Sequence, residues 1–494
     1  MTRANRRGKA GVLRQALAVA LVALGALAMT VDAAAVERTE ELVITSEIEG
    51  RQVVLPTDLP MDLLWYSPAV GLEGGRIVRG WVMAEVVLLE TDKNYLICVQ
   101  RENGTEKWRC VLEDKVRYEP SVSRNNVVVN VNNILVGIDK RVGEIRWRLK
   151  PTFVMSNGPV IVDPAAYPKA YTKEWKNLEH VYVASWQGRL HSMLVRGRIT
   201  TFYRGKDDDS SLAAPDFDLF YPWHKTLGSR GIISTPLNTL EDIMYYSADD
   251  KNVYAVTRDG EEREPYTMQG EPCTPLTITL ATCYVGCRDF SLYALDRLTL
   301  RKKWTYPCGA MPFGRVYSDE PAEHTFVFFP TAADGVHALK VQSARGGGPK
   351  DLMQVPESFE VAWKVPLAQG AIGASQTHVY LGYDLAKDFS GYRQAAAVEK
   401  ASGKVAWKSE SKGVRFFLEF QNAWRNPEQH LRLYAVTEDN RLVALKEKAT
   451  EAGPLKLPKK PVEAPKEVKK VPGQAQAKVE GKTEEAAPEK KEEK

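Results

Sequence analysis

The chain has 494 residues, of which 44% are hydrophobic, so length and composition allow either several ordinary domains or one large repeat architecture. Residues 1–35 contribute +4 and residues 451–494 contribute +2 to the formal net charge of +4, which leaves −2 for residues 36–450. This nearly neutral central region has no basic surface for nucleic acid, so no nucleic-acid partner is expected.

The chain begins with basic residues, followed by an apolar stretch from Ala16 to Val31. The stretch is shorter than the ~20 residues that span a bilayer, and small-residue cleavage patterns lie near its end. We therefore predict a secretory signal peptide over residues 1–35 and an exported protein, periplasmic or secreted, with an uncleaved membrane anchor as the alternative. No cysteine precedes Cys98, so the lipid anchor of a bacterial lipoprotein is not expected.

A polar lead-in over residues 36–60 is followed by short β-rich runs that alternate with turn residues over 61–448. Many short strands at regular spacing indicate a sandwich, a barrel or a propeller, and internal repeats distinguish these folds. Three segments of eleven residues have a small residue first, glycine seventh and tryptophan last: 98–108, 137–147 and 397–407. The glycine tolerates the positive φ of a tight hairpin turn, and the aromatic residue closes the outer strand.

Weaker copies complete the repeat. Residues 294–304 have Leu300 in place of the glycine, and residues 192–202 end in Phe202. We expect eight aromatic side chains to dock on neighbouring blades: Trp65, Trp108, Trp147, Phe202, Tyr266, Trp304, Trp363 and Trp407. Their mean spacing of about 49 residues is close to the ~40–50 residues of propeller repeats. The sequence therefore predicts an all-β fold, an eight-bladed β-propeller with four-stranded antiparallel blades.

The two ends of the repeat region complement each other. Trp65 lies before the first complete repeat, and the repeat that begins at Leu442 lacks its tryptophan. We predict that the strand at Trp65 closes the ring against strands from about 413–448. Residues 449–494 are rich in Lys, Glu, Pro and Ala and contain no aromatic residue, which predicts a disordered tail.

The pattern A-x-D-x-x-x-G-x-x-x-W resembles the tryptophan-docking motif of the quinoprotein (PQQ)-type β-propellers, and the resemblance covers residues 61–448. That family includes the PQQ-dependent alcohol dehydrogenases and the BamB-type accessory proteins of outer-membrane β-barrel assembly. The dehydrogenases resemble one another in an adjacent cysteine pair over the cofactor, a catalytic Asp and a Glu/Asn set on calcium. No two cysteines are adjacent here, so no catalytic, cofactor-binding or metal-binding residue carries over, and no cofactor is expected.

Six cysteines in an exported chain permit disulfides. Cys98 and Cys110 flank one predicted hairpin turn, and Cys273 and Cys283 flank another, so each pair can lie across two strands. Free buried thiols are the alternative.

The insertion over residues 203–223 is the candidate binding site. It follows a predicted outer strand and precedes an inner one, which would place it on the face where loops gather around the central channel. It contains Phe217, Phe220, Tyr221 and Trp223, and aromatic residues on loops held by a rigid scaffold commonly serve recognition. The alternative is that these rings plug the channel or cover a strand edge.

These patterns favour a monomeric binding or scaffolding protein, not an enzyme, that engages an unidentified envelope or periplasmic protein. Contact with a membrane is expected only through an uncleaved signal or weakly through the tail. The alternative function, implied by the family resemblance alone, is a PQQ-dependent oxidoreductase of alcohols or sugars that would need PQQ and calcium.

Overall fold

The computed structural model divides into two units, residues 1–448 and 449–494, and every residue described below lies in the first. The described residues are 43–45, 52–54, 61–68, 70, 72–162, 179–195, 219–226, 238–240, 243–257, 261–319, 325–342, 358–386, 391–409, 413–419 and 432–447. Among them no helix is long and apolar enough to cross a membrane.

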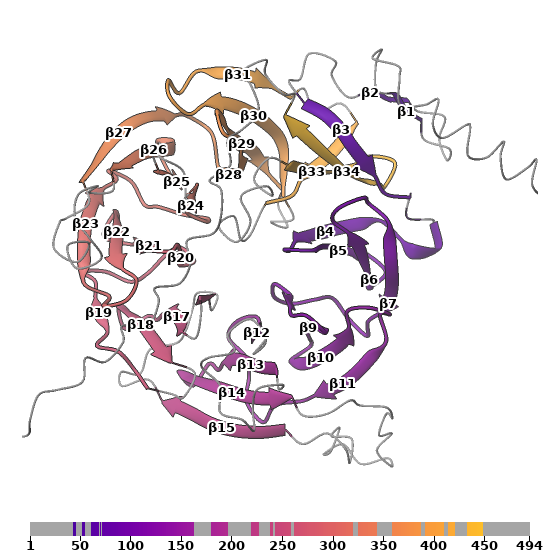
Figure 1. Ribbon diagram of the computed structural model, residues 1–494, viewed down its shortest axis with the longest axis horizontal. Coiled ribbons are helices and arrows are strands. Elements are labelled where there is room, and N and C mark those ends of the chain that lie inside the picture. Colours follow the sequence, from indigo (N-terminus) through magenta and orange to yellow (C-terminus); the bar gives the residue numbers. More distant parts are fainter. Residues whose placement is uncertain are drawn as a thin grey trace, which may run out of the picture. The chain divides into compact units, whose positions relative to one another are not determined.

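The described strands are arranged around a ring as six four-stranded antiparallel sheets and one eight-stranded sheet (Figure 1). The eight-stranded sheet divides into two blades at the single pair of Tyr392 with Phe417, so we describe eight blades, numbered in chain order. Blade 1 contains β4 (Ile77–Val82), β5 (Val86–Thr91), β6 (Tyr95–Gln100) and β7 (Glu106–Val111). Blade 2 contains β8 (Ser121–Val122), β9 (Asn126–Val131), β10 (Ile134–Asp139) and β11 (Ile145–Leu149). Blade 3 contains β12 (Val160–Val162), β13 (Glu179–Ala184), β14 (Arg189–Val195) and β15 (Leu219–Thr226). Blade 4 contains β16 (Asn238–Leu240), β17 (Ile243–Ser247), β18 (Asn252–Thr257) and β19 (Tyr266–Thr267).

Blade 5 contains β20 (Thr277–Ile278), β21 (Thr282–Cys287), β22 (Ser291–Asp296) and β23 (Lys302–Pro307). Blade 6 contains β24 (Tyr317–Ser318), β25 (Thr325–Thr331), β26 (Gly335–Gln342) and β27 (Ser358–Val365). Blade 7 contains β28 (Gly370–Ala374), β29 (His378–Leu385), β30 (Tyr392–Glu399) and β31 (Val405–Lys408). Blade 8 contains β32 (Val414–Phe417), β33 (Arg432–Thr437), β34 (Leu442–Glu447) and β3 (Met61–Tyr66). A short pair, β1 (Val43–Thr45) and β2 (Gln52–Val54), and the 3-10 turn Leu72–Gly74 complete the described elements.

The expected fold class is confirmed, and so is the composition of the last blade. Trp65 in β3 lies opposite Ala444 in β34, although almost the whole ring separates them in sequence. A buried cluster then joins blade 8 to blade 1, with Tyr434 and Phe416 packed beside Ile77 and Leu89. The N-terminal strand thus completes the blade that the C-terminal strands begin.

Burial explains why the strands are so apolar. The second strands β5, β9, β13, β17 and β21 are buried along their whole length, because blades pack face to face. In the outer strand β27 only two alternate side chains near its C-terminal end, Trp363 and Val365, are buried. Eight separate apolar clusters lie between successive blades, so each blade depends on both neighbours.

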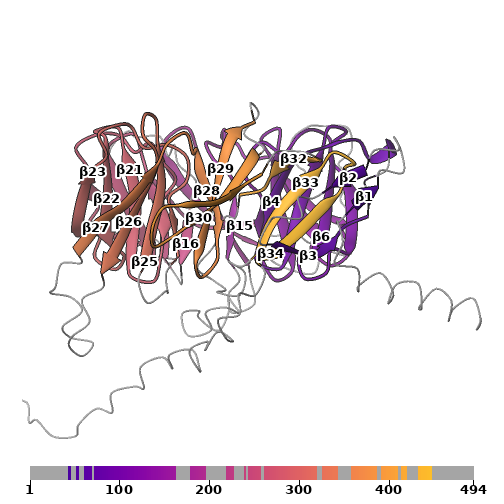
Figure 2. The same ribbon diagram turned by 90° about the horizontal axis from the view of Figure 1, so that it is seen from above.

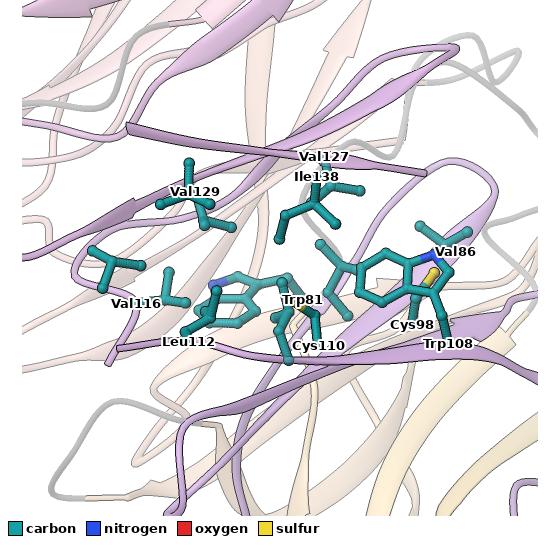
Figure 3. Close-up of a cluster of buried hydrophobic side chains, with 14 of the residues drawn as sticks. Trp81, Val86, Cys98, Trp108, Cys110, Leu112, Val116, Val127, Val129 and Ile138 are labelled. Atoms are coloured by element: carbon teal, nitrogen blue, oxygen red, sulfur yellow. The ribbon is translucent and has the colours of Figure 1, made fainter. Parts of the chain in front are cut away.

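The repeated tryptophan docks on the next blade. The Trp108 Nε1–H donates to the Lys140 carbonyl at 2.8 Å, and its ring lies over Gly143, which has a φ of 79°. Figure 3 shows the same ring among Val86 and Cys98 in the cluster between blades 1 and 2. Trp65 and Trp363 make the equivalent hydrogen bonds to the carbonyls of residues 101 and 400.

The remaining docking positions divide into three groups. Trp147, Trp304 and Trp407 are buried opposite a glycine or alanine of their own blade, as the repeat predicts. In blade 4 the predicted Tyr266 lies opposite Val253 and packs against Tyr293, but the side chain that donates to the next blade is Tyr245, through its hydroxyl to the carbonyl of residue 297. Phe202 lies outside the described residues.

Candidate functional site

The predicted aromatic insertion is not a loop between blades. Phe220, Tyr221 and Trp223 lie in β15, the outer strand of blade 3, and Trp223 is paired with Ser192. The placement of Phe220, Tyr221 and Trp223 on a loop over the central channel was therefore wrong, because these three residues belong to a strand paired with β14. Phe217 lies outside the described residues.

Exposed apolar side chains gather on a different surface. Figure 2 shows the strands from the side, with one rim at each of their ends. Because neighbouring strands are antiparallel, the turn between the second and third strands of a blade lies at the same rim as the end of its fourth strand, where the chain leaves for the next blade, and we call this rim the loop face. Phe290, Met311 and Leu367 lie there with exposed fractions of 52%, 39% and 84%. We call these three residues the apolar arc.

Backbone contacts hold the arc in sequence around blades 5 to 7. The Phe290 carbonyl accepts a hydrogen bond from the Cys308 N–H (2.7 Å), and the Met311 carbonyl accepts one from the Ala332 N–H (2.9 Å). Leu367 lies against the turn at Gly335, where an added Cβ would be 2.9 Å from the Leu367 nitrogen. The three apolar side chains are therefore presented by ordered turns.

Ion pairs flank the arc. Arg288 lies 3.3 Å from Glu271, and Lys364 lies 2.9 Å from Asp334. The hydrogen bond from Lys364 lowers the pKa of Asp334. With Asp289 beside Phe290, the flanking groups comprise three carboxylates and two cations, so the surroundings are polar and slightly acidic.

Two further exposed apolar residues, Trp186 and Val154, lie on the loop face at blade 3. Trp186 occupies the turn between β13 and β14, and its backbone N–H donates to the Val154 carbonyl at 3.0 Å. About half of each side chain is exposed. The loop face thus presents apolar side chains at two places.

An ion pair crosses the centre of the ring. Arg315 precedes β24 of blade 6 and Glu119 precedes β8 of blade 2, so they belong to opposite blades, yet their side chains are 2.9 Å apart. Burial opposes the charge of Arg315, but Glu119 and Glu419 outweigh it and raise its pKa. Burial, together with Glu119, raises the pKa of Glu419. Three charged groups from three blades therefore meet at the centre.

The central carboxylate Glu119 and the buried His337 each have partners within the described part of the chain. Glu119 is already engaged by a guanidinium, and among the described residues no three His, Cys, Asp or Glu side chains are grouped to hold a metal ion. The buried His337 lies between Tyr306 and Asp334, and burial lowers its pKa to about 4. It is a neutral core histidine near neutral pH.

Neither possible disulfide is formed, and the alternative of free thiols is what the structure has. Cys98 lies opposite Trp108 and Cys110 opposite Leu96, so the two cysteines are out of register. Cys283 lies opposite Ile278, whereas the Cys273 N–H donates to the Gly286 carbonyl. All six cysteines are free thiols, and burial raises the pKa of Cys98, Cys273 and Cys308 to about 12.

Comparison with known proteins gives a consistent fold. The family model for the outer membrane protein assembly factor BamB matches residues 50–196. BamB from Moraxella catarrhalis is similar in structure, with 13% identity, a TM-score of 0.50, and coverage of 80% of this chain and 99% of its own. At this identity the likeness supports the propeller fold alone.

Two further solved structures are similar at lower scores. The computationally designed Ika8 protein is 11% identical, with a TM-score of 0.46 and coverage of 78% of this chain and 99% of its own. A quinohemoprotein alcohol dehydrogenase from Pseudomonas putida is 10% identical, with a TM-score of 0.46 and coverage of 82% and 79%. No curated protein matches the sequence.

Proposed function

We propose that this chain, which resembles the PQQ-type β-propellers in its fold and over residues 50–196, is a protein-binding module of the cell envelope that acts without catalysis. The observation that carries the proposal is the loop face, where exposed apolar side chains stand on ordered turns of a ring whose blades are packed on both sides. Apolar and aromatic groups held by a rigid scaffold are typical of protein recognition sites.

Two further observations support this function. The ion pair between Glu119 and Arg315 occupies the centre of the ring, which leaves the rim as the surface for recognition. The matching family model is named for an outer membrane protein assembly factor, and the basic and apolar leader of this chain is typical of exported proteins. A scaffolding role in the envelope is consistent with both.

Photocrosslinking tests the proposal. A photoreactive amino acid is placed at Leu367 on the loop face or at Leu280, which is 52% exposed in the turn between the first and second strands of blade 5 and so lies on the opposite rim. In native cells the loop-face position should give a discrete adduct with an envelope protein, and the control position should not. Equal adducts from both rims, or none from either, would contradict the proposal.

A further inference from the structure

We propose that the apolar arc of Phe290, Met311 and Leu367 is the anchor of the loop face, and that its occupant is a segment of a partner protein with several apolar side chains and no net negative charge. This inference rests on the proposed function and deepens it. Backbone geometry, exposure and charge at the arc each support it.

Two arc residues have a backbone conformation that their side chains disfavour. At the turn between second and third strands, six other blades place residues with positive φ: Asn94, Asn133, Gly188, Lys251, Gly335 and Asn440. Five of these are asparagine or glycine, the types that tolerate the left-handed region. Blade 5 has Phe290 at this position with a φ of 63°, and Leu367 has a φ of 65° in the connection from blade 6 to blade 7.

Core packing does not explain why Phe290 and Leu367, and not asparagine or glycine, occupy these positive-φ positions. Leu300 also has a positive φ, of 55°, but its side chain is 1% exposed and belongs to the core between blades 4 and 5, so burial compensates for the backbone. Phe290 and Leu367 combine the same strain with side chains that are mostly in solvent. Strain that no packing repays is characteristic of functional positions.

The charges around the arc select the kind of partner. Arg288 and Lys364 lie two and three residues before Phe290 and Leu367, and each is paired with a carboxylate. Apolar side chains with polar groups beside them are the usual anatomy of a protein interface. Asp289, which accepts hydrogen bonds from the Ser291 N–H and the Tyr293 hydroxyl, adds a third carboxylate to the two cations. An apolar segment with a neutral or basic flank is therefore complementary, whereas an anionic lipid surface would be repelled.

Asparagine substitutions separate this proposal from a structural role. Asparagine tolerates positive φ, so Phe290→Asn and Leu367→Asn remove the apolar side chains while relieving the backbone. We expect the melting temperature of the double variant to be unchanged or higher, whereas binding should weaken by about tenfold or more. Leu280→Asn, on the opposite rim, is the matched control and should not alter binding.

The binding probe is a library of short random peptides displayed on phage and panned on the purified full chain. Enriched peptides should carry aromatic or aliphatic residues beside lysine or arginine, and should lose affinity for the double variant but not for the control. Failure to enrich such peptides, equal binding to the double variant, or a lowered melting temperature of that variant would overturn the proposal. So would arc-dependent sedimentation with phosphatidylglycerol vesicles, because that would identify a membrane as the occupant.

The photocrosslinking experiment keeps the two proposals apart. It is repeated with the photoreactive group at Trp186, on the loop face but outside the arc, in the wild-type chain and in the double variant. If the adduct persists undiminished in the double variant, the arc is not the anchor and the proposed function stands. If the wild-type chain gives no adduct, the proposed function itself fails.

Discussion

Replacing Gly143 with alanine tests the docking contact on which the ring depends. A Cβ at this position would lie 2.6 Å from Cγ of Trp108, closer than real Cβ atoms approach a ring, and the φ of 79° is left-handed. The backbone conformation costs alanine about 1–2 kcal/mol. Overpacking against the ring adds about 1–3 kcal/mol. We therefore expect the free energy of unfolding to fall by about 2–5 kcal/mol.

Gly309→Ala is the matched control. Gly309 has nearly the same φ, 77°, but nothing lies within 4 Å of an added Cβ, so only the backbone cost of about 1–2 kcal/mol applies. Urea denaturation followed by tryptophan fluorescence measures both variants against the wild-type chain. If the two alanines lower the stability equally, the contact between Trp108 and Gly143 does not stabilise the ring, and tryptophan docking is refuted as the device that joins the blades.

Four other outcomes are expected. Arg315→Met should lower the stability by about 1–2 kcal/mol, between the values for exposed and buried pairs. Burial raises the pKa of Glu419, so the folded chain loses stability as pH rises and this carboxyl must ionise. Arg315 opposes this shift, so removing Arg315 raises the pKa of Glu419 further. The melting temperature of Arg315→Met should therefore fall further below that of the wild-type chain near pH 8 than near pH 5. Burial lowers the pKa of His337 from 6.5 to about 4, so the free energy of unfolding of the wild-type chain should fall by up to about 3 kcal/mol as pH falls between those values. His337→Gln should flatten that part of the plot of stability against pH, and an unchanged plot would contradict the assignment of His337 as a buried neutral histidine. A thiol reagent should react slowly with the native chain and titrate six thiols after denaturation without reductant; fewer than six would reveal a disulfide. Deleting residues 61–66 should leave β34 unpaired and cause aggregation, measured by light scattering, whereas deleting 455–494 should leave the melting temperature unchanged.

Much of the fold could be predicted because the repeat contains residues from both sides of the docking contact, as for Trp65 with Gly104, Trp108 with Gly143 and Trp363 with Gly403. Tryptophan marks the outer strand, the small residue marks its neighbour in the same blade, and glycine marks the turn that receives the ring from the preceding blade. Pairs such as Ala397 with Trp407 follow directly from this spacing. The complementarity of the two ends also predicted that the strand at Trp65 closes the ring against strands from about 413–448, and the observed partner is β34.

Prediction failed where an insertion separates paired strands. In blade 3 residues 196–218 lie between β14 and β15, and Phe202 occupies the eleventh position of the repeat by spacing alone. The residue paired with Ser192 is Trp223, and recognising this pairing from the sequence requires knowing where the strand resumes. As a result, three residues that were predicted to form a binding loop lie in the outer strand β15.

The apolar arc gave only a faint signal in the sequence. Hydrophobic periodicity does not mark Phe290, Met311 or Leu367, because each lies in a turn or connection and not in a strand. Aligning the turns between second and third strands would have placed Phe290 in a column otherwise filled mainly by asparagine and glycine. The ion pair of Glu119 and Arg315 gave no signal, because only ring closure brings blades 2 and 6 face to face.

Affinity capture with paired baits tests the proposed binding role of the loop face most directly. Full-length wild-type chain and the Phe290→Asn, Leu367→Asn double variant are immobilised at equal density and exposed to the same solubilised envelope fraction, and bound proteins are quantified by mass spectrometry. We predict that at least one envelope protein is enriched by the wild-type chain and reduced by about tenfold on the double variant. The same proteins in the same amounts on both baits would contradict this role.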